Sequence, residues 1–140
     1  MTIRLNPYIS FTNNAREAIE FYHSVFGGEL TINTFADQHA SQDPSEDNLI
    51  MHSMVVAPNG LTLMASDTTA RMPHTPGDSM SVSLSGEAAD EATLTGYWQK
   101  LMDGGTETYP LSKAVWGDSF GMGKDRFGVA WLVNIAAPPA

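Results

Sequence analysis

An internal duplication constrains the fold of this 140-residue chain more than any other feature of its sequence. The segment ISFTNNA at 9–15 matches VSLSGEA at 82–88 in hydropathy at an offset of 73. NGLTLMA at 59–65 likewise matches FGVAWLV at 127–133, at an offset of 68. The pair Gly27-Gly28 recurs as Gly104-Gly105. Each half therefore predicts the same order of elements, namely a strand, a helix and then three strands.

In the first half, alternating hydropathy predicts a strand over Ile3–Phe11, with Ile3, Leu5, Ile9 and Phe11 on the core face. Asn13 and Asn14 are candidates to cap the helix that follows, which Gly27-Gly28 should end. Further strands are predicted at 29–35, 49–57 and 61–66. The polar segment 37–48 lacks periodicity and predicts a mobile loop.

In the second half, the larger offset of the glycine pair predicts a helix about one turn longer than the first. The segment 116–134 predicts a hairpin with Trp116, Asp118, Phe120 and Met122 on one side of its first arm. Asp125 suits the turn, where carboxylates bond to nearby backbone N–H groups, as Asp67 does at the end of its own strand.

Composition predicts one domain over residues 1–140, with module 1 at about 1–67, a linker at about 68–78 and module 2 at about 79–135. The absence of cysteine excludes disulfides, thiol nucleophiles and cysteine-based metal sites. A net charge of −9 with seven Lys and Arg argues against a nucleic-acid partner. No signal peptide or membrane-spanning run is found, so we expect a cytoplasmic protein without a membrane partner.

The element order, together with FYHSVFGGE, IMHSMV, LTLMASD and WGDSFGMGKDRFGVAWLVN, resembles the PhnB-like branch of the vicinal oxygen chelate superfamily. That superfamily includes glyoxalase I, extradiol dioxygenases and bleomycin-binding resistance proteins. The resemblance implies an α+β fold of two tandem βαβββ modules, with a curved, mostly antiparallel sheet around a central cavity and helices outside. It also implies a homodimer. One scaffold carries many activities in this superfamily, so the resemblance does not select one.

Metal-dependent members of the superfamily place ligands on the first and last strand of each module. The matching positions here are Asn6, Met64, Ser79 and Leu132. None is a good ligand for a divalent ion, which prefers imidazole, carboxylate or thiolate. We therefore expect neither a metal nor another cofactor.

Seven residues are candidates to contact a small-molecule ligand. His52 is the one histidine inside a predicted strand, and its imidazole could bind a ligand, act as acid or base, or simply bond to a neighbouring strand. Trp116 and Phe120 offer flat walls, although ordinary packing explains them equally well. The remaining candidates are a phenol, two hydroxyls and a thioether, namely Tyr8, Ser10, Ser81 and Met54.

Three classes of function are compatible with these residues. The first is a metal-free binding protein that holds a small molecule in the hollow between its modules. The second is an enzyme, either a lyase or isomerase with His52 as acid or base or a divalent-metal enzyme with ligands elsewhere. The third is an interaction module without a ligand, whose hollow its own side chains would fill. No predicted strand is followed by a Gly-rich turn that opens a helix, so nothing in the sequence supports a nucleotide-type methyltransferase.

Overall fold

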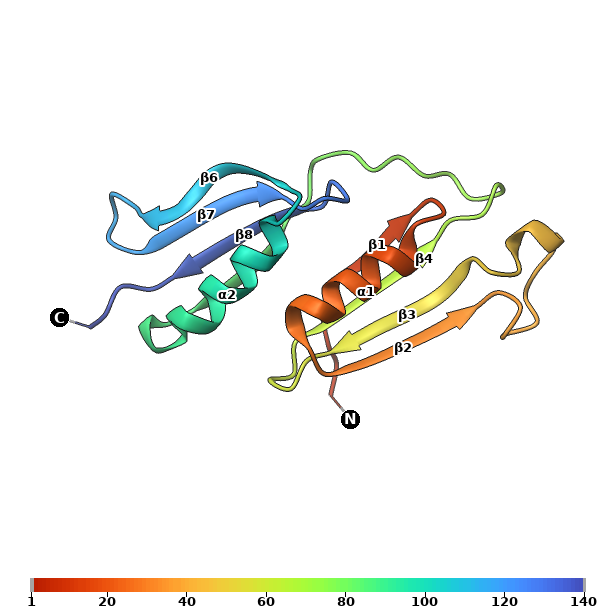
Figure 1. The fold of residues 1–140 in the computed structure, drawn as a ribbon, viewed down its shortest axis with the longest axis horizontal. Helices are drawn as coiled ribbons and strands as arrows, with labels where there is room; N and C mark the ends of the chain where they lie inside the picture. Colours follow the sequence, from red (N-terminus) through yellow and green to blue (C-terminus); the bar gives the residue numbers. More distant parts are fainter. Residues whose placement is uncertain (1, 140) are drawn as a thin grey trace. The chain divides into compact units, whose positions relative to one another are not determined.

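The computed structural model describes residues 2–139 (Figure 1). The chain forms two compact units, one ending at Pro76 and the other beginning at Gly77, and each is described by itself. Over the described residues, each unit contains one α-helix and one mixed, four-stranded sheet in the order βαβββ. The predicted α+β class and the tandem modules are therefore confirmed. Each module has its own sheet, and neither sheet closes on itself.

Unit 1 has the strand order β1-β4-β3-β2, which we call sheet 1. The pair β1 and β4 is parallel, and the other two pairs are antiparallel. The elements are β1 (Tyr8–Phe11), α1 (Ala15–Phe26), β2 (Glu29–Thr34), β3 (Ile50–Val56) and β4 (Thr62–Asp67). Helix α1 lies across one face of sheet 1 (Figure 1), and its apolar stripe is buried as its spacing predicts.

Helix α1 begins with a cap that differs from the predicted one. Asn14 occupies the N-cap position, yet its side chain makes no capping hydrogen bond. Asp67, at the end of β4, instead accepts from the backbone N–H of Ala15 at 3.0 Å and from that of Ile50 at 2.9 Å. One buried carboxylate thus joins α1, β3 and β4. Asp67 therefore has a structural role, as predicted, but its partners are distant in sequence rather than the nearby backbone N–H groups that were expected.

The first strand is shorter than predicted. Ile3 and Leu5 were expected on the core face, yet they are 98% and 100% exposed, and β1 covers only Tyr8–Phe11. Pro7 contributes its carbonyl to the N–H of Met64 at 3.0 Å, but proline has no N–H to donate. Alternation alone does not make a strand where no neighbouring strand supplies hydrogen bonds.

The loop before β3 and the segment after β4 are held against the rest of unit 1 by side-chain contacts. The loop predicted as mobile contains a turn of 3-10 helix at Pro44–Glu46. The nearly buried Glu46 carboxylate pairs with the Arg71 guanidinium at 2.7 Å, and this hydrogen bond lowers the pKa of Glu46 from its ordinary value. Farther along, His74 Nδ1 lies 2.8 Å from the Thr12 hydroxyl. Part of the predicted linker is therefore anchored to unit 1.

Unit 2 repeats this arrangement as sheet 2, with the strand order β5-β8-β7-β6. Its elements are β5 (Val82–Gly86), α2 (Glu91–Met102), β6 (Thr106–Lys113), β7 (Ser119–Lys124) and β8 (Ala130–Ile135). The α-helices α1 and α2 both have 12 residues, so the extra turn that was expected is not part of the α-helix itself. A turn of 3-10 helix at Ala88–Asp90 takes up the extra residues ahead of α2.

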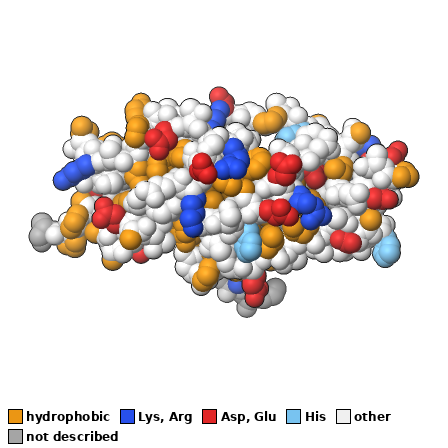
Figure 2. All heavy atoms as spheres, viewed as in Figure 1, with side chains coloured by type: hydrophobic (Ala, Val, Ile, Leu, Met, Phe, Trp, Pro, Cys, Tyr) orange, Lys and Arg blue, Asp and Glu red, His pale blue; other side chains and the backbone are white. Residues whose placement is uncertain are grey.

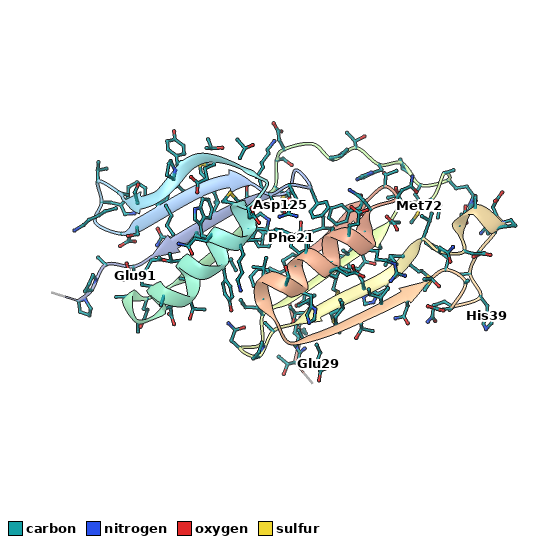
Figure 3. The ribbon with its side chains drawn as sticks, in the orientation of Figure 1. Phe21, Glu29, His39, Met72, Glu91 and Asp125 are labelled. Carbon is teal, nitrogen blue, oxygen red and sulfur yellow. The ribbon has the colours of Figure 1, made fainter. Side chains whose placement is uncertain are left out.

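Glycines on β7 let helix α2 approach sheet 2 closely. A Cβ on Gly121 would lie 3.1 Å from the Trp98 ring, and one on Gly123 would lie 2.6 Å from the Met102 sulfur. Trp131 on β8 is buried, as predicted, and its ring N–H donates to Asp125 at 2.9 Å. Asp125, labelled at the β7–β8 turn in Figure 3, also accepts from two backbone N–H groups of that turn. Its predicted structural role is confirmed.

The side drawn in Figure 2 carries acidic and basic side chains interspersed among uncharged ones. No helix within residues 2–139 is long and apolar enough to span a membrane.

Candidate functional site

Each sheet has one face packed against its helix and one face without a helix, which we call its open face. On sheet 1, strand alternation and register place eleven described side chains on the open face. They are half-buried or exposed, whereas Val55, Leu63 and Ala65 on the helix side are buried. The open face of sheet 1 is formed by Tyr8, Ser10, Glu29, Thr31, Asn33, His52, Met54, Val56, Thr62, Met64 and Ser66.

Four of the predicted ligand-contacting residues lie together on this face. Tyr8 and Met54 both pair with Met64 in register, on its two sides. The rings of Tyr8 and His52 are 5.9 Å apart between centroids and tilted by 51°. Tyr8 is 50% exposed and His52 is half-buried, so both rings remain accessible to a ligand. The face thus combines a phenol, an imidazole, hydroxyls and thioethers.

The other three predicted ligand-contacting residues belong to unit 2, and they lie at different distances from sheet 2: Phe120 within it, Trp116 in the turn beside it and Ser81 before its first strand. Phe120 lies on β7, where it pairs with Asn134 of β8, on the face of sheet 2 away from the buried Trp131. Trp116 precedes β7 in the turn after β6 and is 61% exposed, so the strand predicted to begin at Trp116 is wrong. Its ring nevertheless contacts the Phe120 ring edge-on at a centroid distance of 5.7 Å. Ser81 is exposed and precedes β5, outside the sheet.

A difference in strand register explains the position of Ser81. Ser10 pairs with Ser66 in unit 1, whereas Ser85 pairs with Asn134 in unit 2. Ser66 and Asn134 are equivalent under the offset of 68, so the structural partner of Ser10 is Ser85. The hydropathy match had paired Ser10 with Ser83. The register of β5 against β8 is therefore shifted by two residues relative to the register of β1 against β4. A shift of two residues keeps each side chain on the same face of the sheet, but it places Ser81 before the first residue of β5.

Sequence reasoning missed several members of the two open faces. Asn33 lies opposite His52, and Asn134 lies opposite Phe120. Alternation within each strand shows which residues share a side, but the register between strands is needed to show which residues are neighbours. The Asn134 side chain also donates to Asp118 at 3.1 Å, a contact between a strand and a turn that no local pattern signals.

Register also bears on the positions matched to metal ligands. Met64 faces Tyr8 across the β1–β4 pair, and Leu132 faces Ser83 across the β5–β8 pair. Among residues 2–139, no group of three or more His, Cys, Asp or Glu side chains is placed to hold a metal ion. His23 and His39 lie outside the open face of sheet 1. His23 Nε2 lies 3.0 Å from the Gly28 carbonyl oxygen, and His39 lies in the loop after β2 (Figure 3).

Comparison with known proteins identifies relatives over nearly the whole chain. A family model described as 3-demethylubiquinone-9 3-methyltransferase matches residues 4–134. The solved structure of protein PA1353 from Pseudomonas aeruginosa is 35% identical, with a TM-score of 0.81 over 98% of this chain and 100% of that one. Protein YjdN of Escherichia coli (strain K12) is 28% identical and is matched over 94% of each chain.

More distant structures extend the comparison. A Bacillus cereus PhnB protein, which carries the same methyltransferase description, is 24% identical with a TM-score of 0.70, over 96% of this chain and 100% of that one. Solved members of the glyoxalase/bleomycin resistance/dioxygenase superfamily share the fold at 12% and 14% identity, with TM-scores of 0.64 and 0.63.

Proposed function

This chain belongs to the PhnB-like family described as 3-demethylubiquinone-9 3-methyltransferase, with the fold of the glyoxalase/bleomycin resistance/dioxygenase superfamily, and on that premise we propose that it binds a small molecule without a metal. We place the ligand on the open faces of the modules. The observation that carries this proposal is the grouping of Tyr8, Ser10, His52 and Met54 on one helix-free face. A surface of this mixed character suits a ligand with both apolar and polar parts.

Each proposed contact residue has a distinct chemical role. In unit 1, the Tyr8 ring gives flat apolar contact, and the Met54 thioether adapts to the ligand's shape. In unit 2, the rings of Trp116 and Phe120 give flat apolar contact. Ser10 offers a hydroxyl that both donates and accepts hydrogen bonds, whereas Ser81 lies outside the sheet. The His52 imidazole donates at one ring nitrogen and accepts at the other when it is neutral.

The proposal of metal-free binding rests on the chemistry of the open faces. Hydroxyl, amide, thioether and aromatic groups dominate them. The described side chains on the open face of sheet 1 include one imidazole, His52, and one carboxylate, Glu29, which pairs with Val56 four residues farther along β3. A divalent ion in a catalytic site is held by about three protein ligands of the imidazole, carboxylate or thiolate type. The proposal also includes a cytoplasmic homodimer, since many proteins of this fold pair to cover exposed sheet edges.

Native mass spectrometry of protein purified without chelator tests the proposal directly. We expect a dimer that retains an organic compound, and metal quantification on the same sample should find no stoichiometric divalent ion. An ion present at one per site and removed by chelator contradicts metal-free binding. A protein that carries no compound and binds none of a panel of small aromatic and polar molecules contradicts the binding function itself.

The family description names a methyltransferase, and we do not extend that activity to this chain. Enzymes that bind nucleotide-type cofactors in doubly wound sheets use the carboxyl ends of several parallel strands. Here, each described sheet has one parallel pair flanked by antiparallel strands. The open faces, rather than a strand-to-helix turn, are where we place the ligand.

The alternative is an enzyme in which His52 acts as acid or base, and the accessible position of its imidazole beside Tyr8 favours testing it. With the compound retained by the purified protein as ligand, His52→Ala should weaken binding about tenfold or less if the protein only binds, because one contact is lost. If His52 is a general acid or base, turnover of that compound should fall by roughly a hundredfold or more.

The matched control for this test is His39→Ala, since His39 is exposed in the loop after β2 (Figure 3). We expect it to change neither affinity nor turnover. Calorimetry gives the affinities, and mass spectrometry of the incubated compound shows whether any product forms. Product formation by the unsubstituted chain, together with its loss in His52→Ala alone, would falsify the pure binding function.

A further inference from the structure

An aromatic and acidic cluster lies at one end of the open face of sheet 2. Trp116 and Phe120 meet edge-on at 5.7 Å, and Phe120 pairs in register with Asn134. The Asn134 side-chain amide donates to Asp118 Oδ2 at 3.1 Å, which brings a carboxylate to the same end of the face. We call these four residues, Trp116, Asp118, Phe120 and Asn134, the aromatic–carboxylate cluster.

The hydrogen bonds of the cluster fix which groups it can offer to a ligand. Asp118 Oδ1 accepts from the backbone N–H of Ala137 at 2.9 Å, and this bond, followed by that of Asn134, holds the pKa of Asp118 below its ordinary value. Asp118 is therefore a carboxylate at neutral pH. Because the Asn134 amide nitrogen is turned toward Asp118, its carbonyl oxygen is left as a fixed acceptor.

The cluster is thus rich in acceptors and electron-rich ring faces. Aromatic faces attract cations through their quadrupole, and tryptophan does so most strongly. A carboxylate accepts charge-assisted hydrogen bonds from an ammonium group. The Lys113 ammonium group lies on the other side of sheet 2. Lys113 pairs with Ser119 on β7, and strand alternation places these two side chains on the face that does not carry Phe120. The net charge of −9 also favours the approach of cationic ligands.

We propose that the aromatic–carboxylate cluster binds the protonated amine of an organic cation, with the ammonium group at Asp118 and Asn134 and the apolar part against Trp116 and Phe120. This inference rests on the proposed binding function, because it names the ligand class for part of that surface. No covalent step is involved. All four residues belong to unit 2, so the cluster is complete within one module.

Three probes of similar size and different charge test this ligand class. The probes are 2-phenylethylamine as cation, 2-phenylethanol as neutral molecule and phenylacetate as anion. Tryptophan fluorescence reports binding at the cluster, because Trp116 is 61% exposed whereas Trp98 and Trp131 are buried. We expect the cation to bind about tenfold more tightly than the alcohol and the anion to bind most weakly. Added salt should reduce this preference.

Substitutions then assign the charge preference to Asp118. Asp118→Asn should remove most of the preference for the cation while retaining weak binding of the alcohol. Asp103→Asn is the matched control, because it removes one negative charge from an exposed side chain of the same unit that pairs with Arg126. Should Asp118→Asn fail to fold, Trp116→Leu changes an exposed ring instead. Calorimetry, which does not depend on the Trp116 signal, should then show weaker binding of all probes that contact the rings.

The outcomes separate this inference from the proposed function. Equal affinity for cation and alcohol, or a preference that survives in Asp118→Asn, overturns the cation site while small-molecule binding stands. If none of the probes binds but the purified protein retains a different organic compound, the cation site is likewise overturned and small-molecule binding stands. When no probe binds and no compound is retained, both the ligand class and the binding function are wrong.

Discussion

Replacing Gly28 by alanine is expected to lower the free energy of unfolding by about 2–5 kcal/mol. Gly28 has φ +86°, a left-handed conformation that costs other residues roughly 1–2 kcal/mol. A Cβ there would also lie 2.0 Å from the Val56 carbonyl oxygen, which is backbone and cannot move aside without shifting β3. Overpacking of this kind costs about 1–3 kcal/mol or more. Urea unfolding followed by far-ultraviolet circular dichroism measures the loss.

Two further glycines separate the causes of this effect. Gly60 has φ +92° with open space where a Cβ would lie, so Gly60→Ala should show the conformational cost alone. Gly105 is the counterpart of Gly28 in unit 2, and a Cβ there would lie 2.3 Å from the Lys124 carbonyl oxygen. Gly105→Ala should therefore show the steric cost. A Gly28→Ala protein no less stable than Gly60→Ala contradicts the close packing of β2 against β3.

Asp67→Ala is expected to cost about 2–4 kcal/mol of stability. The variant leaves the backbone N–H groups of Ala15 and Ile50 without their acceptor, and both residues are almost completely buried. An unsatisfied buried donor costs roughly 1–3 kcal/mol, and the cap of α1 is lost as well. The three tryptophans all lie after residue 77, so circular dichroism rather than their fluorescence should follow the unfolding of unit 1.

Asp67→Asn provides the matched comparison, because the amide keeps one acceptor oxygen in the same shape. It should lose less stability than Asp67→Ala. Asp37 offers an exposed control, since it accepts from the Thr34 N–H where water can take its place. Equal stability of Asp67→Ala and Asp37→Ala would show that the carboxylate does not join α1 to β3 and β4.

Local patterns in the sequence were sufficient to predict most helices and strands. The apolar stripe of α1, the turns at Gly60 and Gly128 and the burial of Trp131 all follow from spacing and from residue type. Each of these features depends on contacts within a few residues or on one periodic face. The grouping of Tyr8, Ser10, His52 and Met54 was partly predictable, because alternation assigns each side chain to a face of its own strand.

Predictions that required a partner strand or a distant cap were less successful. Ile3 and Leu5 alternate like a strand but have no ladder, and Trp116 continues the alternation of β7 into a turn. Asn14 is a good capping residue by type, yet Asp67 supplies the capping oxygen. In each case a contact between segments far apart in sequence overrode the local preference.

The sequence by itself determined the duplication, the two βαβββ modules and the side of each strand that faces a helix, because these depend on periodicity and on turn residues. Only the tertiary structure decided which side chains became neighbours. The register of β5 against β8 excluded Ser81 from the sheet, and the turn before β7 brought Asp118 to Asn134. Register and long-range hydrogen bonds are set by the packing of whole elements, and no single segment of the chain encodes them.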